Sequence, residues 1–356
     1  MKTFDCDNCG ERIFFENTSC LACGSMVGFV PEHLTLSAFR PDAGGYSGIV
    51  GDASGSLWKK CRNYTEANVC NWMLPADSAE EYCLSCRLNE VIPDLSVGNK
   101  RTLWAKMEAA KRRLMFSLLR LRLPILNKED DPDRGLAYRF LADPGDDFAR
   151  TRRVLTGHDA GVITINIAEA DDAVREKMRL DMREVYRTLL GHFRHESGHY
   201  YWDRLFADTG REEAFRAVFG DEREDYAGAL KRHYRNGPPP DWQERHITSY
   251  AAAHPWEDWA ETWAHYLHIT DTLDTACCNG IEIRTPEGKH IVRDPLRERF
   301  SSVAQDWFAL RFVLNSLNRS MGLQDPYPFV MGSAVIEKLT YIHDWLRYRH
   351  DTGHEQ

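Results

Sequence analysis

The sequence contains no uninterrupted apolar run near the roughly 18 residues that a membrane-spanning helix needs. Its mean hydropathy is −0.51, and it contains no internal repeat and no long low-complexity tract. Basic residues are not in excess, because 45 Lys and Arg stand against 54 Asp and Glu, a net charge of −9. These absences disfavour a membrane protein and a protein whose main partner is a nucleic acid.

A secretory leader is also missing, because the first residues lead directly into a cysteine motif, and we therefore expect a cytoplasmic protein. The chain has 356 residues, of which 43% are hydrophobic and 28% are charged. That composition is typical of a globular protein with about two domains, or with one large domain and an appendage.

Eight of the ten cysteines lie in the first quarter of the chain. The first four form two C-x2-C pairs, each followed by a glycine: Cys6, Cys9, Cys20 and Cys23. Two residues between thiolates let both sulfurs reach one tetrahedral zinc ion, and the glycine permits a tight turn beneath it. The spacing predicts a zinc ribbon over residues 1–30.

The second cysteine set contains a single C-x2-C pair and consists of Cys61, Cys70, Cys83 and Cys86. We predict a second four-thiolate zinc module over residues 55–95, because disulfides would need an oxidising compartment that nothing in the sequence indicates. Cys277 and Cys278 have no complementary pair, and we predict that they are buried small apolar side chains. The glycine-rich stretch 31–57 is interpreted as a loop-rich connection.

Residues 96–130 are predicted to contain a basic amphipathic linking helix, over 100–122, with leucines at helical spacing. Its charges predict a solvated face, or alternatively a surface for nucleic acid or an acidic partner. Strands are expected at 138–142 and 162–168, a long helix at 173–205, and amphipathic helices at 307–317 and 334–348. The fold class is therefore α+β, mostly helical with a small sheet.

The long helix contains an H-E-x-x-H motif formed by His195, Glu196 and His199. Two histidines four residues apart project from one helical face and can hold one zinc ion, and the adjacent glutamate can reach a water molecule on that ion. The alternative is a helix with ordinary surface histidines. A metzincin-type third ligand is excluded, because the positions that would hold its glycine and histidine are Trp202 and Leu205.

A second helix, with Pro255 in its first turn, carries Glu257 and Glu261 one turn apart on a shared face. We predict that Glu257 is the third zinc ligand and that Glu261 hydrogen-bonds the outer nitrogen of a ligand histidine; the reverse assignment stays open. Asp203, one turn after His199, could orient a ligand histidine or lie in solvent.

The motif followed about fifty to sixty residues later by E-x-x-x-E resembles the gluzincin metallopeptidases. The stretch from Glu257 to Glu261 is especially similar to the E-F-F-A-E helix of lethal-factor-type and Mlc-titration-factor-type peptidases. That resemblance implies that Tyr250, seven residues before Glu257, stabilises the transition state. The bulky Tyr200 and Tyr201 after the motif depart from the small residues common in those relatives.

The cysteine-rich N-terminus together with this core resembles a bacterial family of zinc-binding metallopeptidases with an N-terminal zinc-ribbon-like region. The resemblance implies a zincin-like, gluzincin-type peptidase domain over residues 131–356, preceded by small zinc-ribbon modules. One catalytic and two structural zinc ions are expected, with a peptide or protein as substrate. The strand at 162–168 is interpreted either as an edge to which an extended peptide adds or as an internal strand.

Two other functions stay open from the sequence. One is an inactive zincin-fold binding or adaptor protein whose zinc ribbons contact a protein partner. The other is a di-iron oxidoreductase, since Glu196 and His199 also fit a carboxylate-bridged site, although that class needs a second Glu-x-x-His on another helix.

Overall fold

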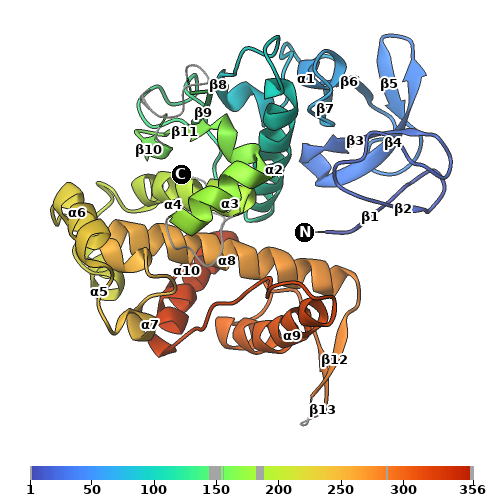
Figure 1. Ribbon diagram of the computed structural model, residues 1–356. Helices are drawn as coiled ribbons and strands as arrows, with labels where there is room; N and C mark the ends of the chain where they lie inside the picture. Colours follow the sequence, from blue (N-terminus) through green and yellow to red (C-terminus); the bar gives the residue numbers. More distant parts are fainter. Residues whose placement is uncertain (1, 144–153, 155, 182–187, 286–287, 353–356) are drawn as a thin grey trace. The chain divides into compact units, whose positions relative to one another are not determined.

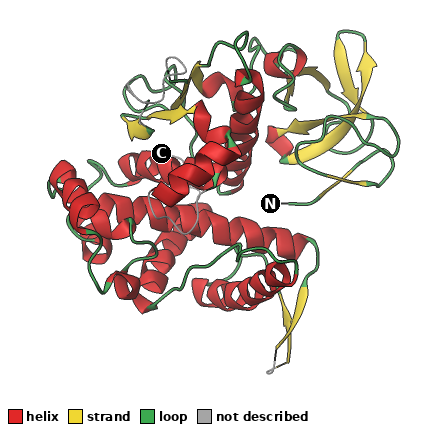
Figure 2. Ribbon diagram, in the orientation of Figure 1, coloured by secondary structure: helices red, strands yellow, loops and turns green. Residues whose placement is uncertain are grey.

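The computed structural model describes residues 2–143, 154, 156–181, 188–285 and 288–352. The chain forms two compact units, an N-terminal unit over Lys2–Glu176 and a C-terminal unit over Lys177–Gln356 (Figure 1). The N-terminal unit holds most of the strands and the C-terminal unit is mainly helical (Figure 2). The predicted α+β class is confirmed. Among the described helices, none combines the length and the apolar character needed to cross a bilayer.

The N-terminal unit contains a five-stranded antiparallel sheet in the order β3-β4-β5-β6-β7. Its strands are Met26–Val30, Thr35–Asp42, Gly45–Gly48, Leu57–Lys60 and Met73–Pro75. The prediction of a loop-rich connection over 31–57 is therefore wrong, because β4 and β5 lie within it. Some of its glycines allow close strand contact instead: a Cβ atom at Gly45 would lie 2.5 Å from the Trp58 carbonyl oxygen.

Short elements surround the two cysteine sets. Strands β1 (Phe4–Asp5) and β2 (Arg12–Ile13) pair in antiparallel fashion beside the first set. Helix α1 (Arg62–Thr65) and the 3-10 helix η2 (Cys86–Leu88) flank the second set. The rings of Phe15 and Phe29 lie 5.0 Å apart between centroids. Aromatic packing therefore supplements the small core around the cysteines.

A second sheet, in the order β10-β11-β9-β8, completes the strands of this unit. Its strands are Gly157–Asp159, Val162–Asn166, Ala137–Leu141 and Asn89–Val91. Strand β11 pairs with β10 on one side and with β9 on the other, so the prediction of a peptide-accepting edge at 162–168 is wrong and the internal alternative holds. The tight turn through Ala160 and Gly161, both at positive φ, folds β10 back onto β11.

Helix α2 (Lys100–Arg120) matches the expected helix, but its basic residues do not all form a solvated face. The side chain of Lys111 is fully buried and its ammonium lies 2.9 Å from the equally buried Glu108 carboxylate. Arg112, also buried, donates to the Val69 carbonyl oxygen. The prediction of a solvated basic surface is wrong at these positions, because the cations satisfy buried acceptors.

The C-terminal unit is built around two helices, α4 (Leu189–Leu205) and α8 (Pro255–Cys278). Other elements that lie within it are α5 (Glu212–Phe219), α6 (Tyr226–Asn236), α7 (Trp242–Arg245), η4 (Ala251–Ala253), the β12–β13 hairpin (Glu282–Thr285 and Gly288–Ile291), α9 (Phe300–Ser320) and α10 (Ser333–Thr352). The two helices expected near the C-terminus correspond to α9 and α10, each longer than predicted.

The prediction of a single long helix over 173–205 is wrong. Helix α3 covers Asp172–Asp181, and α4 begins only after Thr188, whose backbone is extended. The Thr188 hydroxyl accepts a hydrogen bond from the Gly191 backbone amide at 3.0 Å and so caps α4.

The expected burial of Cys277 and Cys278 is also wrong. Cys277 is half-buried and Cys278 is exposed, because both lie in the last turn of α8, just before the chain leaves the helix at Asn279.

Candidate active site and zinc sites

Helices α4 and α8, the long orange helix of Figure 1, pack closely where the H-E-x-x-H motif lies. A Cβ atom at Gly198 would lie 2.8 Å from the α-carbon of Ala260, so glycine at this position permits the approach. Two indoles of α8 fix the contact: Trp259 donates to the Gly198 carbonyl oxygen at 2.8 Å, and Trp263 donates to the Ser197 hydroxyl at 3.1 Å.

This packing brings His195, His199 and Glu257 together, with their ligand atoms all within 4.8 Å of one another. The two Nε2 atoms lie 3.2 Å apart. The Oε2 atom of Glu257 lies 3.1 Å from the His195 Nε2 and 3.5 Å from the His199 Nε2. All three residues belong to the C-terminal unit, and Glu257 is 1% exposed.

These distances fit a zinc site. With Zn–N and Zn–O bonds of about 2.1 Å, the edge of a tetrahedron between two ligand atoms is about 3.4 Å. The three measured separations scatter around that value, and three protein ligands leave the fourth position for solvent or substrate, as in catalytic zinc sites. Without a metal, burial raises the pKa of Glu257, but the charges and hydrogen bonds of His199 and His195 lower it well below its usual range.

The outer nitrogen of His195 is held by Glu261, whose Oε1 lies 2.6 Å from Nδ1. Because a carboxylate accepts, Nδ1 carries a proton, and Nε2 is the nitrogen that faces Glu257 and His199 and can bind a metal. The second Glu261 oxygen accepts from the Thr248 hydroxyl at 2.7 Å, which in turn accepts from the Ala251 amide at 3.0 Å. The structure thus places Glu257 beside both histidines and Glu261 behind one of them.

Glu196 lies beside this site on α4 and is 5% exposed. One of its oxygens, Oε1, is 3.2 Å from the His192 Nε2. Burial raises the pKa of Glu196, but the His192 contact and the nearby His195 and His199 lower it below its usual range, so the carboxylate is ionised at neutral pH. The other oxygen, Oε2, is buried without a hydrogen-bond partner among the described residues.

Tyr250 precedes the short helix η4, and its ring centroid lies 6.0 Å from that of His195. Burial and the charge of Glu257 raise the pKa of Tyr250 far above its ordinary value, so its hydroxyl remains a hydrogen-bond donor. Asp203 is half-buried one turn after His199, and its part in orienting a ligand stays a prediction.

Four residues that contact the site are not among the site residues predicted from the sequence. His192 contacts Glu196, Thr248 contacts Glu261, and the Trp256 ring lies 4.0 Å from that of His199 between centroids. The Tyr226 hydroxyl donates to the Glu257 Oε1 at 2.5 Å. Two of them carry a sequence signal: His192 lies three residues before His195, where it could compete as a metal ligand, and Trp256 belongs to a run of tryptophans that could line a cleft or form core. No spacing rule marks Tyr226 and Thr248, because they reach the site through tertiary packing.

The first cysteine set also converges. Cys6 and Cys23 lie 3.7 Å apart between sulfurs, and so do Cys9 and Cys20. A tetrahedral zinc with Zn–S bonds of about 2.3 Å has an S–S edge of about 3.8 Å, whereas a disulfide bond is about 2.05 Å long. The four thiols therefore fit a zinc ion and not two disulfides. Cys6 and Cys20 are buried, and Cys9 and Cys23 are exposed.

The second set forms a similar cluster in which all four cysteines are buried: Cys61, Cys70, Cys83 and Cys86. The sulfurs of Cys70 and Cys83 are 3.8 Å apart, again the edge length of a zinc tetrathiolate. The Cys83 amide points to the Cys61 sulfur at 3.4 Å, and the Trp72 amide to the Cys70 sulfur at 3.4 Å. Such amides stabilise thiolates, so this cluster also fits zinc.

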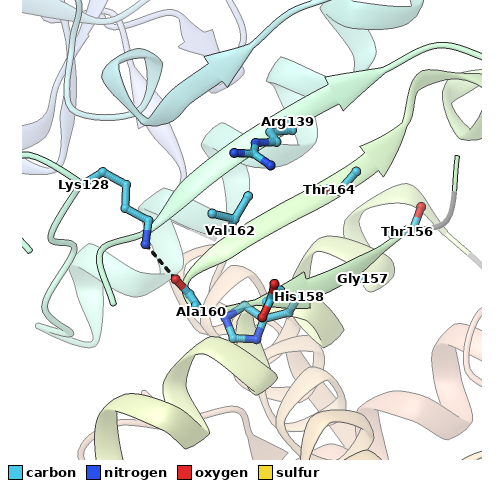
Figure 3. A pocket seen from close by; sticks show the side chains of 9 residues that line it. Lys128, Arg139, Thr156, Gly157, His158, Ala160, Val162 and Thr164 are labelled. Atoms are coloured by element: carbon cyan, nitrogen blue, oxygen red, sulfur yellow. Dashed lines mark hydrogen bonds between the residues drawn. The ribbon is translucent and has the colours of Figure 1, made fainter. Parts of the chain in front are cut away.

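A surface hollow of about 460 Å³ lies on the second sheet and includes Lys128, Arg139 and His158 (Figure 3). These three polar side chains have partners within the fold. The Lys128 ammonium donates to three carbonyl oxygens, including that of Ala160 at 2.7 Å, and Arg139 forms a bidentate pair with Glu90. The His158 Nε2 accepts from the Gly161 amide at 3.0 Å. We therefore assign no chemistry to this hollow.

Two four-cysteine clusters in the N-terminal unit and one His2Glu cluster in the C-terminal unit define a zinc-binding protein with an N-terminal zinc ribbon and a separate three-ligand site. The chain belongs to the family described as "Putative zinc-binding metallo-peptidase", whose model matches residues 100–345. A zinc-ribbon domain model matches residues 3–97 and so includes both cysteine sets.

Relatives with high identity occur in mycobacteria. Uncharacterized proteins of Mycobacterium bovis and of two Mycobacterium tuberculosis strains are each 44% identical to this chain over 345 residues, which is 96% of the chain and 94% of the relative. No solved structure matches the chain.

The predicted domain boundaries at residues 30, 55, 95 and 130 stay a prediction.

Proposed function

We propose that this protein is a zinc-dependent peptidase that hydrolyses peptide bonds, with Glu196 as the general base. The observation that carries the proposal is the convergence of His195, His199 and Glu257 within 4.8 Å, with the ionised Glu196 on the same helix as the two histidines. Membership of the metallopeptidase family supports the same reaction class. The substrate we propose is a peptide or protein.

The three ligands would hold the catalytic zinc, and the two cysteine clusters would hold two structural zinc ions. When bound, a zinc ion at the three-ligand site supplies Lewis-acid polarisation and lowers the pKa of solvent toward neutrality. The protein orients the ligand atoms: Glu261 holds a proton of His195 on Nδ1, so that Nε2 is the nitrogen available to the metal.

Glu196 moves the proton in this proposal. Its Oε2 accepts a proton from the attacking water and then delivers it to the amine that leaves when the C–N bond breaks. His192 contacts the other oxygen at 3.2 Å and so fixes the carboxylate in one orientation. General bases of this kind contribute about 10²- to 10⁴-fold to the rate.

Tyr250 supplies a hydrogen bond to the carbonyl oxygen as negative charge develops there. The pKa of Tyr250 is raised by burial and by Glu257, so the phenol keeps its proton at neutral pH. Loss of one donor of this type costs about 2.7 to 4 kcal/mol of transition-state stabilisation. Tyr250→Phe is expected to lower kcat and to leave the zinc content unchanged.

The test compares wild type with Glu196→Gln on a quenched-fluorescence peptide library, with zinc content measured on the same preparations. We expect Glu196→Gln to keep its zinc and to lose hydrolysis about 10²-fold or more. The exposed Glu213→Gln is the matched control, since the Glu213 side chain is 90% exposed. Hydrolysis by Glu196→Gln at the wild-type rate would overturn the assigned base. A fully metallated wild-type protein that cleaves no library member would favour the adaptor alternative.

A further inference from the structure

Tyr226 lies at the start of helix α6, and its hydroxyl donates to Glu257 at 2.5 Å. The two oxygens of Glu257 therefore have different neighbours. Oε2 faces the Nε2 atoms of His195 and His199, whereas Oε1 is occupied by the tyrosine. Glu257 is 1% exposed, so solvent does not compete for either oxygen.

The tyrosine is itself held in place from several sides. Its ring makes edge contacts with His254 and Trp256, at 5.2 Å and 5.6 Å between centroids. The His254 Nδ1 accepts from the Trp256 amide at 3.1 Å, and its Nε2 donates to the Glu224 carbonyl oxygen at 3.1 Å. The Asp225 side chain caps α6 by accepting from the Gly228 amide at 3.1 Å.

A carboxylate can bind a metal through one oxygen or through both. If both oxygens of Glu257 bound, the protein would supply four donor atoms and fill the position that a hydrolytic zinc site leaves open. A hydrogen bond to one oxygen keeps that oxygen away from the metal and fixes the orientation of the carboxylate.

We propose that Tyr226 is a positioning residue that holds Glu257 as a one-oxygen metal ligand and so keeps the fourth coordination position open. The benefit of an open position rests on the proposed function, because only catalysis needs it. The contact between Tyr226 and Glu257 exists whether or not the protein cleaves peptide bonds. The inference gives the two tyrosines near Glu257 separate roles: Tyr226 bonds to Glu257, whereas Tyr250 acts on the carbonyl oxygen of the substrate in the proposed reaction.

The test uses the full chain as Tyr226→Phe, Tyr250→Phe and Tyr234→Phe, the last a control on the same helix with a residue that is 65% exposed. Zinc affinity is measured by competition with a chromophoric chelator. Cobalt(II) is then substituted at the His2Glu site, and its visible absorption reports the coordination number. Thermal unfolding of each variant checks that the fold is retained.

We expect Tyr226→Phe to weaken zinc binding at this site about 10- to 100-fold and to reduce the cobalt absorption, as expected for a five-coordinate ion. Tyr250→Phe and Tyr234→Phe should bind zinc and cobalt as wild type does. Wild-type zinc affinity together with an unchanged cobalt spectrum in a folded Tyr226→Phe would overturn the inference. Neither the zinc affinity nor the cobalt spectrum requires hydrolysis. These two measurements therefore test the role of Tyr226 even if the protein cleaves no peptide.

Discussion

The Oε1 atom of Glu261 lies 2.6 Å from the Nδ1 of His195, so a carboxylate on one helix sets the proton position of an imidazole on another. The contact joins the first half of α8 to the middle of α4, beside the metal-binding residues. Burial lowers the pKa of His195, but its bonds to Glu257 and Glu261 outweigh that effect and raise it well above its ordinary value. A zinc ion therefore competes with a proton for Nε2.

This contact predicts the effect of Glu261→Gln. An amide presents a weaker acceptor than a carboxylate, and it can also turn its NH2 group toward Nδ1, so the imidazole orientation loosens. We expect zinc affinity at the His2Glu site to fall about 10- to 100-fold, measured by chelator competition. Thr248→Val removes the hydrogen bond to the second Glu261 oxygen and the one from the Ala251 amide but leaves the His195–Glu261 contact, so it should have a smaller effect. Equal zinc affinity in wild type and Glu261→Gln would contradict the role given to Glu261.

The two cysteine clusters should differ in reactivity because they differ in exposure. Cys9 and Cys23 are exposed, whereas all four cysteines of the second set are buried. Without metal, hydrogen bonds from Ser25 and Asn8 lower the pKa of Cys23 to about 6, so its thiol is ionised at pH 7.

Under a chelator at pH 7, with iodoacetamide present, we therefore expect alkylation of Cys23 before any cysteine of the second set. Peptide mass spectrometry after timed quenching measures the order. Labelling of Cys61 or Cys83 first would show that exposure does not control release.

The buried histidine His265 predicts how stability depends on pH. Its Nδ1 lies 2.7 Å from the Tyr327 hydroxyl, and burial lowers its pKa to about 4. Between about pH 6.5 and pH 4 the unfolded chain binds a proton that the folded chain does not, so the free energy of unfolding falls as the pH falls. The full effect of this shift is about 3 kcal/mol.

His265→Asn should remove that part of the pH dependence, although it lowers stability at neutral pH by deleting a packed ring. Urea unfolding at a series of pH values measures the slope, with a substitution at the exposed His33 as control. An unchanged slope below pH 6.5 in His265→Asn would contradict this account.

The parts of the site that the sequence predicted are those set by local geometry. His195, Glu196 and His199 share one helix, so their spacing alone determines which side chains project together. Glu257 and Glu261 follow the same rule on α8. The C-x2-C pairs are local in the same sense and predict the first cluster, whereas in the second set only Cys83 and Cys86 form such a pair.

The parts that were not predicted depend on contacts between distant segments. Tyr226 reaches Glu257 from α6, and Thr248 reaches Glu261 from the loop before η4; neither lies in a motif. Strand β11 was open to two interpretations because its partner β10 is only three residues long and carries no alternating pattern. Lys111 was expected in solvent because a basic run gives no sign of the buried Glu108 three residues away.

We expect His195, His199 and Glu257 to hold one zinc ion apart from the two cysteine clusters. The most direct test of this central claim is the number of zinc ions per chain in wild type and in Glu257→Ala, measured by mass spectrometry of the metal content after equilibration with buffered zinc. We predict about three ions in wild type and about two in Glu257→Ala. The same count in both proteins would contradict the claim.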